Sequence, residues 1–362
     1  MKKIIFGIVV LVFAIGFFIV KSNQSNNPQK TSQETLSESI VQHDKEEIQN
    51  NPQKKFLFVP YWALTQDKIP SDDYDQFIYF GIAVNNQGID KIEQGFTGLE
   101  RFVKTADASK EKLLAVRMLD KDTNFAILKD KSLQEKIIQQ TIDLAKQNEF
   151  EGVVLDLEIS SLPFASVTTQ MNDFVAVFYK AAKKENLSFS LILFGDTFYK
   201  LRPYDVVSLV KTTDHMLIMA YDFHKAKGEP GPNFPFSGKE TYGYDFKTMT
   251  EDFLNIVPAE RLTIVFGMFG YDWVVDENGK AIETGKSLSL FSIKEKFINN
   301  CLFKNCKVKR DEESAETKIS YIDNKGNHHI VWFEDEESVA KKMEFLKEKG
   351  LNSIGYWAYS YY

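Results

Sequence analysis

The chain has 362 residues, of which 43% are hydrophobic and 14% aromatic, which suits one large domain with a sizeable core plus appended segments. Its formal net charge is −7 and its body contains no block of Lys and Arg, so a nucleic-acid partner is not expected. The two cysteines, Cys301 and Cys306, are either unrelated thiols or a small local disulfide. Cys and His form no metal-binding pattern, and we expect neither a metal ion nor another cofactor.

The N-terminal segment, residues 1–21, predicts a membrane anchor. Ile4 to Val20 is an uninterrupted apolar run flanked by lysines, at the short end of the length that spans a bilayer. No small-x-small cleavage site follows it, which favours an uncleaved anchor over a signal peptide. The lysines before the run would keep the N-terminus in the cytoplasm. The sequence therefore predicts a single-pass protein of the cell membrane with an extracellular domain, or a secreted protein if the segment is cleaved.

Residues 22–54 are polar and rich in Gln, Asn and Ser, a composition that predicts a disordered tether. The remaining residues, 55–362, contain eight short apolar runs with amphipathic helical patterns between several of them. Nearly continuous apolar runs are typical of parallel strands that are covered on both faces. The predicted fold class is therefore α/β, a (β/α)8 TIM barrel. The predicted strands are 55–62, 76–84, 112–118, 152–158, 188–194, 215–221, 262–269 and 353–359.

The interval between the seventh and eighth predicted strands is longer than one connecting helix requires. It contains a hairpin pattern that turns at Asn324-Lys325-Gly326. We therefore expect a small α+β insertion at about residues 275–333.

Two carboxylates end the fourth predicted strand. Asp156 and Glu158 are two residues apart, so their side chains should point to the same face. Asp222 follows the sixth strand, and active sites of such barrels lie at the carboxyl ends of the strands. The structural alternative is a buried ion pair or capping carboxylates. Aromatic residues near the same strand ends would complete a sugar-binding site: Tyr61, Trp62, Phe80, Tyr271, Trp273 and Trp357.

Three segments resemble glycoside hydrolase family 18, the chitinases and their relatives, including bacterial cell-wall members. Residues 151–158, EGVVLDLE, are similar to the family's Asp-Gly-x-Asp-x-Asp-x-Glu motif, with Glu151 and Val154 in place of the first two acids. Residues 219–222, MAYD, resemble the Met-x-Tyr-Asp of the sixth strand, and Trp357 matches the eighth-strand tryptophan. The family's glycine-bearing third-strand motif is not evident.

The resemblance implies substrate-assisted, retaining hydrolysis of glycans that contain β-linked N-acetylglucosamine, such as peptidoglycan or chitin. It implies that Glu158 is the general acid and base, and that Asp156 and Tyr221 hold the substrate acetamide. Met219, Asp222 and Trp357 would contact the sugar. Because Val154 removes an acid that shares charge with Asp156, activity could be lower or its pH range shifted. The alternative is a non-catalytic or weakly active glycan-binding protein, but retention of Glu158 favours an enzyme.

Overall fold

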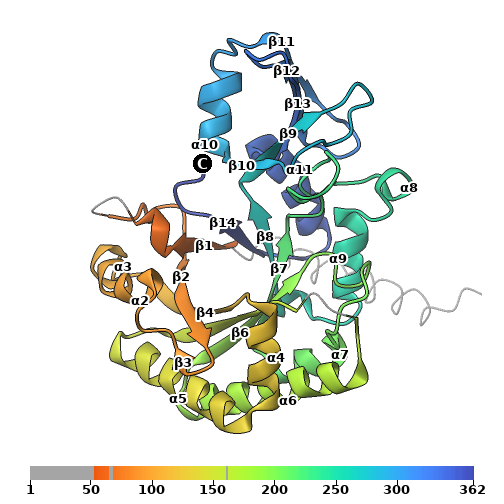
Figure 1. Cartoon of the computed structure of the whole chain (residues 1–362). Coiled ribbons are helices and arrows are strands. Elements are labelled where there is room, and N and C mark those ends of the chain that lie inside the picture. Colours follow the sequence, from red (N-terminus) through yellow and green to blue (C-terminus); the bar gives the residue numbers. More distant parts are fainter. Residues whose placement is uncertain (1–52, 65–67, 160–161) are drawn as a thin grey trace, which may run out of the picture. The chain divides into compact units, whose positions relative to one another are not determined.

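The computed structural model describes residues 53–64, 68–159 and 162–362 (Figure 1). The predicted anchor, residues 1–21, and the predicted tether up to residue 52 lie outside the described residues. The first strand, β1 (Lys54–Pro60), begins one residue before the predicted start of the folded domain.

The predicted location in the cell membrane is corrected by the structure. In the described ranges, no helix is both long enough and apolar enough to cross a bilayer. Even α6 (Ala165–Lys184), with 20 residues, is amphipathic and ends in lysines, because only one of its faces packs on the barrel. The expectation rested on residues 1–21, outside those ranges, so nothing in the described chain supports a membrane as partner.

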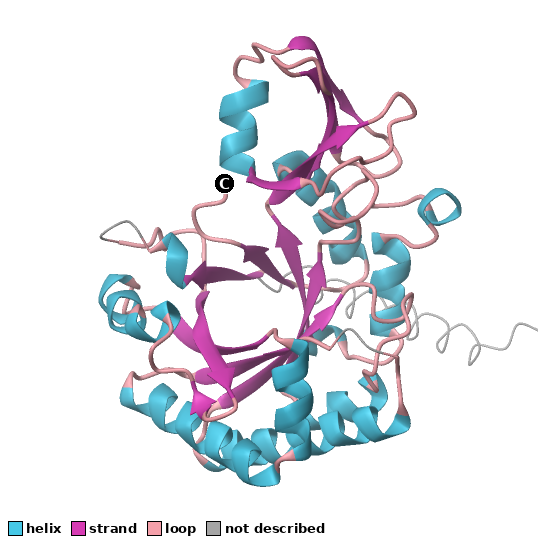
Figure 2. Cartoon of the chain, in the orientation of Figure 1, coloured by secondary structure: helices cyan, strands magenta, loops and turns pink. Residues whose placement is uncertain are grey.

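Eight parallel strands of the described chain close into a barrel, which confirms the predicted fold class (Figure 2). The barrel order is β1-β2-β4-β5-β6-β7-β8-β14, and β14 pairs with β1. Most strand residues are buried, because one face points into the barrel and the other lies under helices. The remaining barrel strands are β2 (Gln76–Asn85), β4 (Glu111–Met118), β5 (Gly152–Leu157), β6 (Ser188–Phe194), β7 (His215–Ala220), β8 (Leu262–Gly267) and β14 (Ser353–Trp357). A two-residue strand, β3 (Gly88–Ile89), pairs antiparallel with β2.

Helices cover the outside of the barrel (Figure 1). Several begin with an aspartate whose side chain accepts a hydrogen bond from a backbone N–H of the first turn, among them α5 at Asp130 and α11 at Asp335. Such caps typically contribute about 1 kcal/mol each. Besides α6, the helical elements of the barrel are η1 (Tyr61–Ala63), α2 (Gln94–Thr97), α3 (Leu99–Thr105), α4 (Lys121–Lys129), α5 (Lys131–Gln147), α7 (Val206–Leu209), η2 (Val210–Thr212), α8 (Lys239–Tyr242), α9 (Phe246–Leu254), η3 (Ala259–Arg261) and α11 (Glu336–Glu348).

A second sheet lies between β8 and α11 and forms the predicted insertion. Its five strands within the described residues are antiparallel, in the order β10-β9-β13-β12-β11. The insertion begins at Phe269, earlier than expected, because β8 ends at Gly267 and the chain passes directly into β9. A disulfide joins Cys301, which precedes the edge strand β11, to Cys306 within that strand. The elements are β9 (Phe269–Val275), β10 (Lys286–Ser289), α10 (Leu290–Ile293), the π-helix η4 (Lys294–Ile298), β11 (Lys304–Arg310), β12 (Thr317–Ile322) and β13 (His328–Phe333).

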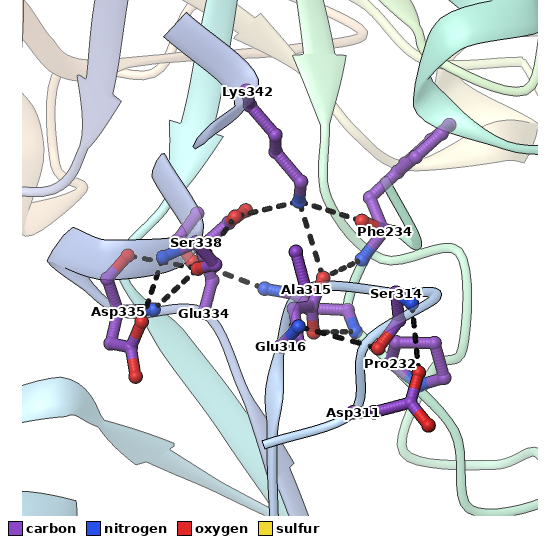
Figure 3. A network of polar contacts seen from close by, with 12 residues as sticks. Pro232, Phe234, Asp311, Ser314, Ala315, Glu316, Glu334, Asp335, Ser338 and Lys342 are labelled. Carbon is purple, nitrogen blue, oxygen red and sulfur yellow. Dashed lines mark hydrogen bonds and ion pairs between the residues drawn. The ribbon is translucent and has the colours of Figure 1, made fainter. Parts of the chain in front are cut away.

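A buried polar network joins the insertion to the barrel (Figure 3). The ammonium of Lys342, on α11, donates to Glu334 Oε1 at 2.6 Å, to Glu316 Oε1 at 3.3 Å and to the Phe234 carbonyl at 2.6 Å. Glu316, just before β12, also accepts from the backbone N–H groups of Asn233 at 2.5 Å and Phe234 at 2.7 Å. The side chains of Lys342, Glu316 and Glu334 are fully buried. The network therefore ties α11 and the insertion to the loop that follows β7.

Candidate active site

Asp156 and Glu158 project from the carboxyl end of β5 into one cavity of about 270 Å³, as their spacing predicts. Hydrogen bonds from neighbouring elements fix this strand end. The Glu158 N–H donates to the Met118 carbonyl of β4 at 2.9 Å, and the Tyr204 hydroxyl donates to the Leu157 carbonyl at 2.8 Å. The two carboxyl groups are therefore carried on backbone that is held from both sides.

The cavity brings together most of the residues that the sequence singled out. They come from strand ends far apart in the chain, which the closed barrel places around one opening. The predicted residues that line it are Trp62, Phe80, Asp156, Glu158, Met219, Tyr221, Asp222, Tyr271 and Trp357.

Asp156 is almost completely buried, with 2% of its surface exposed. Burial raises the pKa of its carboxyl well above the ordinary value, and the charge of Glu158 raises it further, whereas Arg117 lowers it. Its Oδ1 atom is buried and accepts no hydrogen bond from the described part of the chain. A buried acceptor without a partner is costly, so this oxygen is available to an N–H donor of a ligand.

The pKa of Glu158 is also raised, chiefly by burial. Asp222 raises it as well, while the positive charges of Lys225 and Arg202 lower it. A raised pKa favours a carboxyl that keeps its proton, which is what a general acid requires.

Asp222 is held from two sides in a left-handed backbone conformation, with φ of 58°. Its backbone N–H donates to Asn233 Oδ1 at 2.8 Å, and its carboxylate accepts from the Tyr271 hydroxyl at 2.6 Å. Asn233 Nδ2 also donates to the carbonyls of Gly267 at 3.1 Å and Phe269 at 3.2 Å. The loop after β7 and the start of the insertion therefore position Asp222 together.

Aromatic rings form one wall of the cavity around Trp357. The Phe80 ring lies nearly perpendicular to it at a centroid distance of 4.7 Å, and the Phe58 and Trp62 rings lie at 5.7 and 6.2 Å. Trp62 is 46% exposed at the opening. Such rings can pack on the apolar face of a sugar while carboxylates bind its hydroxyl groups.

Two predicted aromatic residues do not line the cavity. Trp273 is fully buried, and its indole N–H donates to the Ala226 carbonyl at 3.2 Å. The Tyr61 ring packs edge-on against Trp62 at 5.0 Å and lies 5.0 Å from the Arg117 guanidinium. Both pack against lining residues. Trp273 lies on the same face of β9 as Tyr271, with ring centres 5.5 Å apart, and Tyr61 contacts Trp62.

Sequence reasoning missed several lining residues, mostly apolar ones: Phe58, Leu119, Ile192, Phe194, Lys225, Phe269, Ser287 and Tyr361. Phe194 ends a predicted strand, a signal that would have found it, whereas Phe58 lies in the middle of the predicted strand 55–62. Ser287 belongs to the insertion, and nothing in the sequence places it near β5.

Arg117 was also missed, although it lies beside Asp156 in the register of β4 and β5. Its Nη2 donates to Glu93 Oε1 at 3.0 Å, and its Nε is buried without a partner in the described chain. Its charge therefore acts on Asp156 from the neighbouring strand.

Comparison with known proteins identifies the family. A model of glycosyl hydrolases family 18 matches residues 25–361. YdhD of Bacillus subtilis, a proposed sporulation-specific glycosylase, is 26% identical over 241 residues, which cover 64% of this chain and 52% of that protein. The cortical fragment-lytic enzyme of Bacillus anthracis is 24% identical over 247 residues, covering 65% and 52%. The chain thus matches about half the length of these two relatives.

Solved structures share the fold. The crystal structure of YdhD has a TM-score of 0.65 at 21% identity and covers 79% of this chain and 91% of that one. A chitinase of Cycas revoluta, solved in complex with (GlcNAc)3, has a TM-score of 0.70 at 20% identity and covers 84% and 94%. With the family model matching nearly the whole folded part, the chain belongs to glycosyl hydrolases family 18.

Proposed function

We propose that the protein hydrolyses glycans that contain β-linked N-acetylglucosamine, such as peptidoglycan or chitin, with Glu158 as general acid and base. The observation that supports this best is the pair Asp156 and Glu158, which project from one strand end into one aromatic-walled cavity with raised pKa values. The known chemistry of family 18 points the same way.

The reaction is substrate-assisted and retains the β configuration. The acetamide oxygen of the sugar on the non-reducing side attacks the anomeric carbon, while Glu158 donates its proton to the glycosidic oxygen and the C–O bond breaks. The result is a cyclic oxazolinium intermediate and a free leaving sugar. Glu158, now a carboxylate, takes a proton from water, whose oxygen attacks the anomeric carbon and reopens the ring.

Asp156 accepts the acetamide N–H and stabilises the positive charge that develops in the oxazolinium ring. Its unpartnered Oδ1 is consistent with this role. Tyr221 donates to the acetamide oxygen, Asp222 binds a sugar hydroxyl, and Trp357 stacks under the sugar that reacts. The remaining predicted contacts of the glycan are Trp62, Phe80, Met219 and Tyr271. We assign no glycan contact to Tyr61 and Trp273, because neither lines the cavity.

The test is incubation of the full chain with purified peptidoglycan and with chitin oligomers, with product masses as the readout. We expect the variant Glu158→Gln to bind glycan but to lose about 10²–10⁴-fold in turnover, because Gln is isosteric and delivers no proton. Glu185→Gln, at an exposed ion pair with Lys146, is the matched control and should be unchanged. Near-normal turnover by Glu158→Gln would refute the assignment. A wild-type protein that binds glycan without cleaving it would instead establish the glycan-binding alternative.

A further inference from the structure

Lys225 places a positive charge inside the cavity of the proposed active site. It lies in the loop after β7, three residues beyond Asp222, and its exposed side chain lines the cavity with Glu158 and Asp222. Its ammonium lies 5.4 Å from the centre of the Phe194 ring, which is another lining residue. The ring attracts the cation through its π face and helps to hold it at this wall.

Within the described residues Lys225 forms no ion pair with a carboxylate, although its charge acts at longer range on Glu158 and Asp222. Two neighbouring basic residues, Lys200 and Arg202, both pair with Asp196, at 2.9 and 2.6 Å. Among the residues that the structure describes, no carboxylate oxygen lies within 4.0 Å of the Lys225 ammonium. Lys225 is therefore the basic group of this wall that remains open to an anion from outside the protein.

The positive charge of Lys225 also makes Glu158 a weaker proton holder, although the proposed reaction needs Glu158 protonated. Lys225 is the largest influence that lowers the pKa of Glu158, opposing the effect of burial. A general acid gains nothing from a cation that favours loss of its proton. If the substrate brings an anion to Lys225, the cation is neutralised and Glu158 holds its proton more firmly. A cation that has no ion-pair partner in the described chain is thus suited to an anionic substrate.

We propose that Lys225 forms a subsite for a carboxylate carried by the leaving sugar. The inference rests on the proposed function, in which Glu158 protonates the glycosidic oxygen of the leaving sugar. Lys225 lines the same cavity as Glu158, so its cation faces the substituents of that sugar. Chitin carries no ionised group. In peptidoglycan, the N-acetylmuramic acid unit bears a lactyl ether on O3. The carbon that carries O3 is bonded directly to the carbon that carries the glycosidic O4. The carboxyl group of this ether is therefore carried within a few bonds of the oxygen that Glu158 protonates.

This subsite favours carboxylated glycans over chitin and places N-acetylglucosamine before the cleaved bond and the carboxylated sugar after it. The carboxylate could come from a free lactyl group or, where a stem peptide is amide-linked to that group, from the peptide. The shared chemistry is a carboxylate close to O3, and the test separates the two sources.

The test compares the full chain with Lys225→Gln, Lys225→Arg and Lys227→Gln. Lys227 is an exposed lysine two residues further on that does not line the cavity, which makes it the matched control. The substrates are chitin tetramer, peptide-free muramic acid glycan, the same glycan with its carboxylates amidated, and peptide-bearing glycan. Initial rates between pH 4 and 8 give kcat/KM, and calorimetry gives binding.

We expect Lys225→Gln to reduce kcat/KM on carboxylated glycan about tenfold more than on chitin tetramer, as for loss of one charge-assisted hydrogen bond. Lys225→Arg should largely keep the wild-type ratio, Lys227→Gln should keep it fully, and amidation should reproduce the loss in the wild-type protein. A loss on peptide-bearing glycan alone would assign the carboxylate to the peptide.

Equal losses on chitin and on carboxylated glycan, or no loss, would overturn the Lys225 inference while leaving the proposed function intact. If the wild-type protein cleaves none of the glycans, the proposed function fails. Calorimetry then still decides the subsite, since Lys225→Gln should weaken binding of the peptide-free muramic acid glycan and leave binding of the amidated glycan less affected.

Discussion

Replacing Lys342 by Met should destabilise the protein strongly and in a pH-dependent way. Lys342 is the cation of a fully buried group that contains two carboxyls, Glu316 and Glu334 (Figure 3). Burial raises the pKa of Glu334 to about 8 even though Lys342 opposes that rise. With Glu334 protonated at neutral pH, one cation faces one carboxylate, so the group as a whole is neutral.

Methionine has a similar shape but no charge, so Glu316 would be left without a cation inside the protein. Breaking a buried ion pair by removing one partner typically costs about 3–5 kcal/mol. In the wild-type protein, the raised pKa of Glu334 means that its contribution to stability is complete below about pH 4.5 and lost as the pH rises through about 8. In the folded variant, Glu316 must bind a proton as well as Glu334, because no cation remains beside them. As the pH rises, the free energy of unfolding should therefore fall by about 1.4 kcal/mol more per pH unit in the variant than in the wild type.

The assay is urea unfolding of the full chain at pH 5, 6.5 and 8. We expect Lys342→Met to lose about 1 kcal/mol at pH 5 and, three pH units higher, about 5 kcal/mol at pH 8. The adjacent exposed Lys341 provides the control, and Lys341→Met should change stability by less than about 0.5 kcal/mol. A loss below about 1 kcal/mol at pH 8, or the same loss at all three pH values, would refute the reasoning about the buried charges.

The remaining predictions concern the reaction mechanism and the part that Asp156 plays in it. The product should keep the β configuration by NMR, and a thiazoline analogue of the oxazolinium ion should bind far more tightly than N-acetylglucosamine. Asp156→Ala should weaken binding of the analogue at least tenfold more than binding of the sugar, whereas Tyr221→Phe should reduce the binding free energy of the analogue by only about 0.5–1.5 kcal/mol. Inverted product, or a sugar bound covalently to a carboxylate, would exclude this mechanism. Arg117→Met removes the cation that lowers the pKa of Asp156, so this pKa should rise. The acidic limb of the pH–rate profile should therefore move to higher pH. An acidic limb that does not move would show that Arg117 has no electrostatic effect on the reaction.

The barrel could be predicted because its strands are local features of the sequence. A run such as residues 188–194 is apolar apart from Ser188 and Ser190, as expected of a parallel strand covered on both faces, and it coincides with β6. The acids could be predicted for a related reason, since Asp156 and Glu158 interrupt an apolar strand at its carboxyl end. Strand ends of a barrel meet at one opening, so the sequence also brought Asp222 and Trp357 to the same place.

The start of the insertion was placed too late because β8 and β9 are almost continuous in sequence. Residues 262–275 are largely apolar, with Thr263 and Asp272 as exceptions, and the change from the barrel to the second sheet occurs at Met268. Nothing local marks that change. It depends on β9 pairing with β13, which begins more than 50 residues later, for example Trp273 with Ile330.

Lys342 shows the same limit in the core. A lysine on an amphipathic helix is expected at the surface, and its neighbour Lys341 is indeed exposed. Lys342 is buried because Glu316 and Glu334, which come from the insertion and its end, meet it there. Only the three-dimensional arrangement supplies the partners that make a buried lysine acceptable.

Val154 is where the chain departs most clearly from its family motif, and the structure shows what surrounds Asp156 in its place. Val154 is fully buried in the barrel core and adds no charge. The charge next to Asp156 is instead that of Arg117, aligned with it on the adjacent strand and held by Glu93. A second carboxylate would raise the pKa of Asp156, whereas the guanidinium lowers it. In the proposed reaction, an ionised Asp156 favours the oxazolinium ion. The substitution on β5 and the arginine on β4 thus act in the same direction, which is why the motif can lose an acid and still leave a site suited to the chemistry.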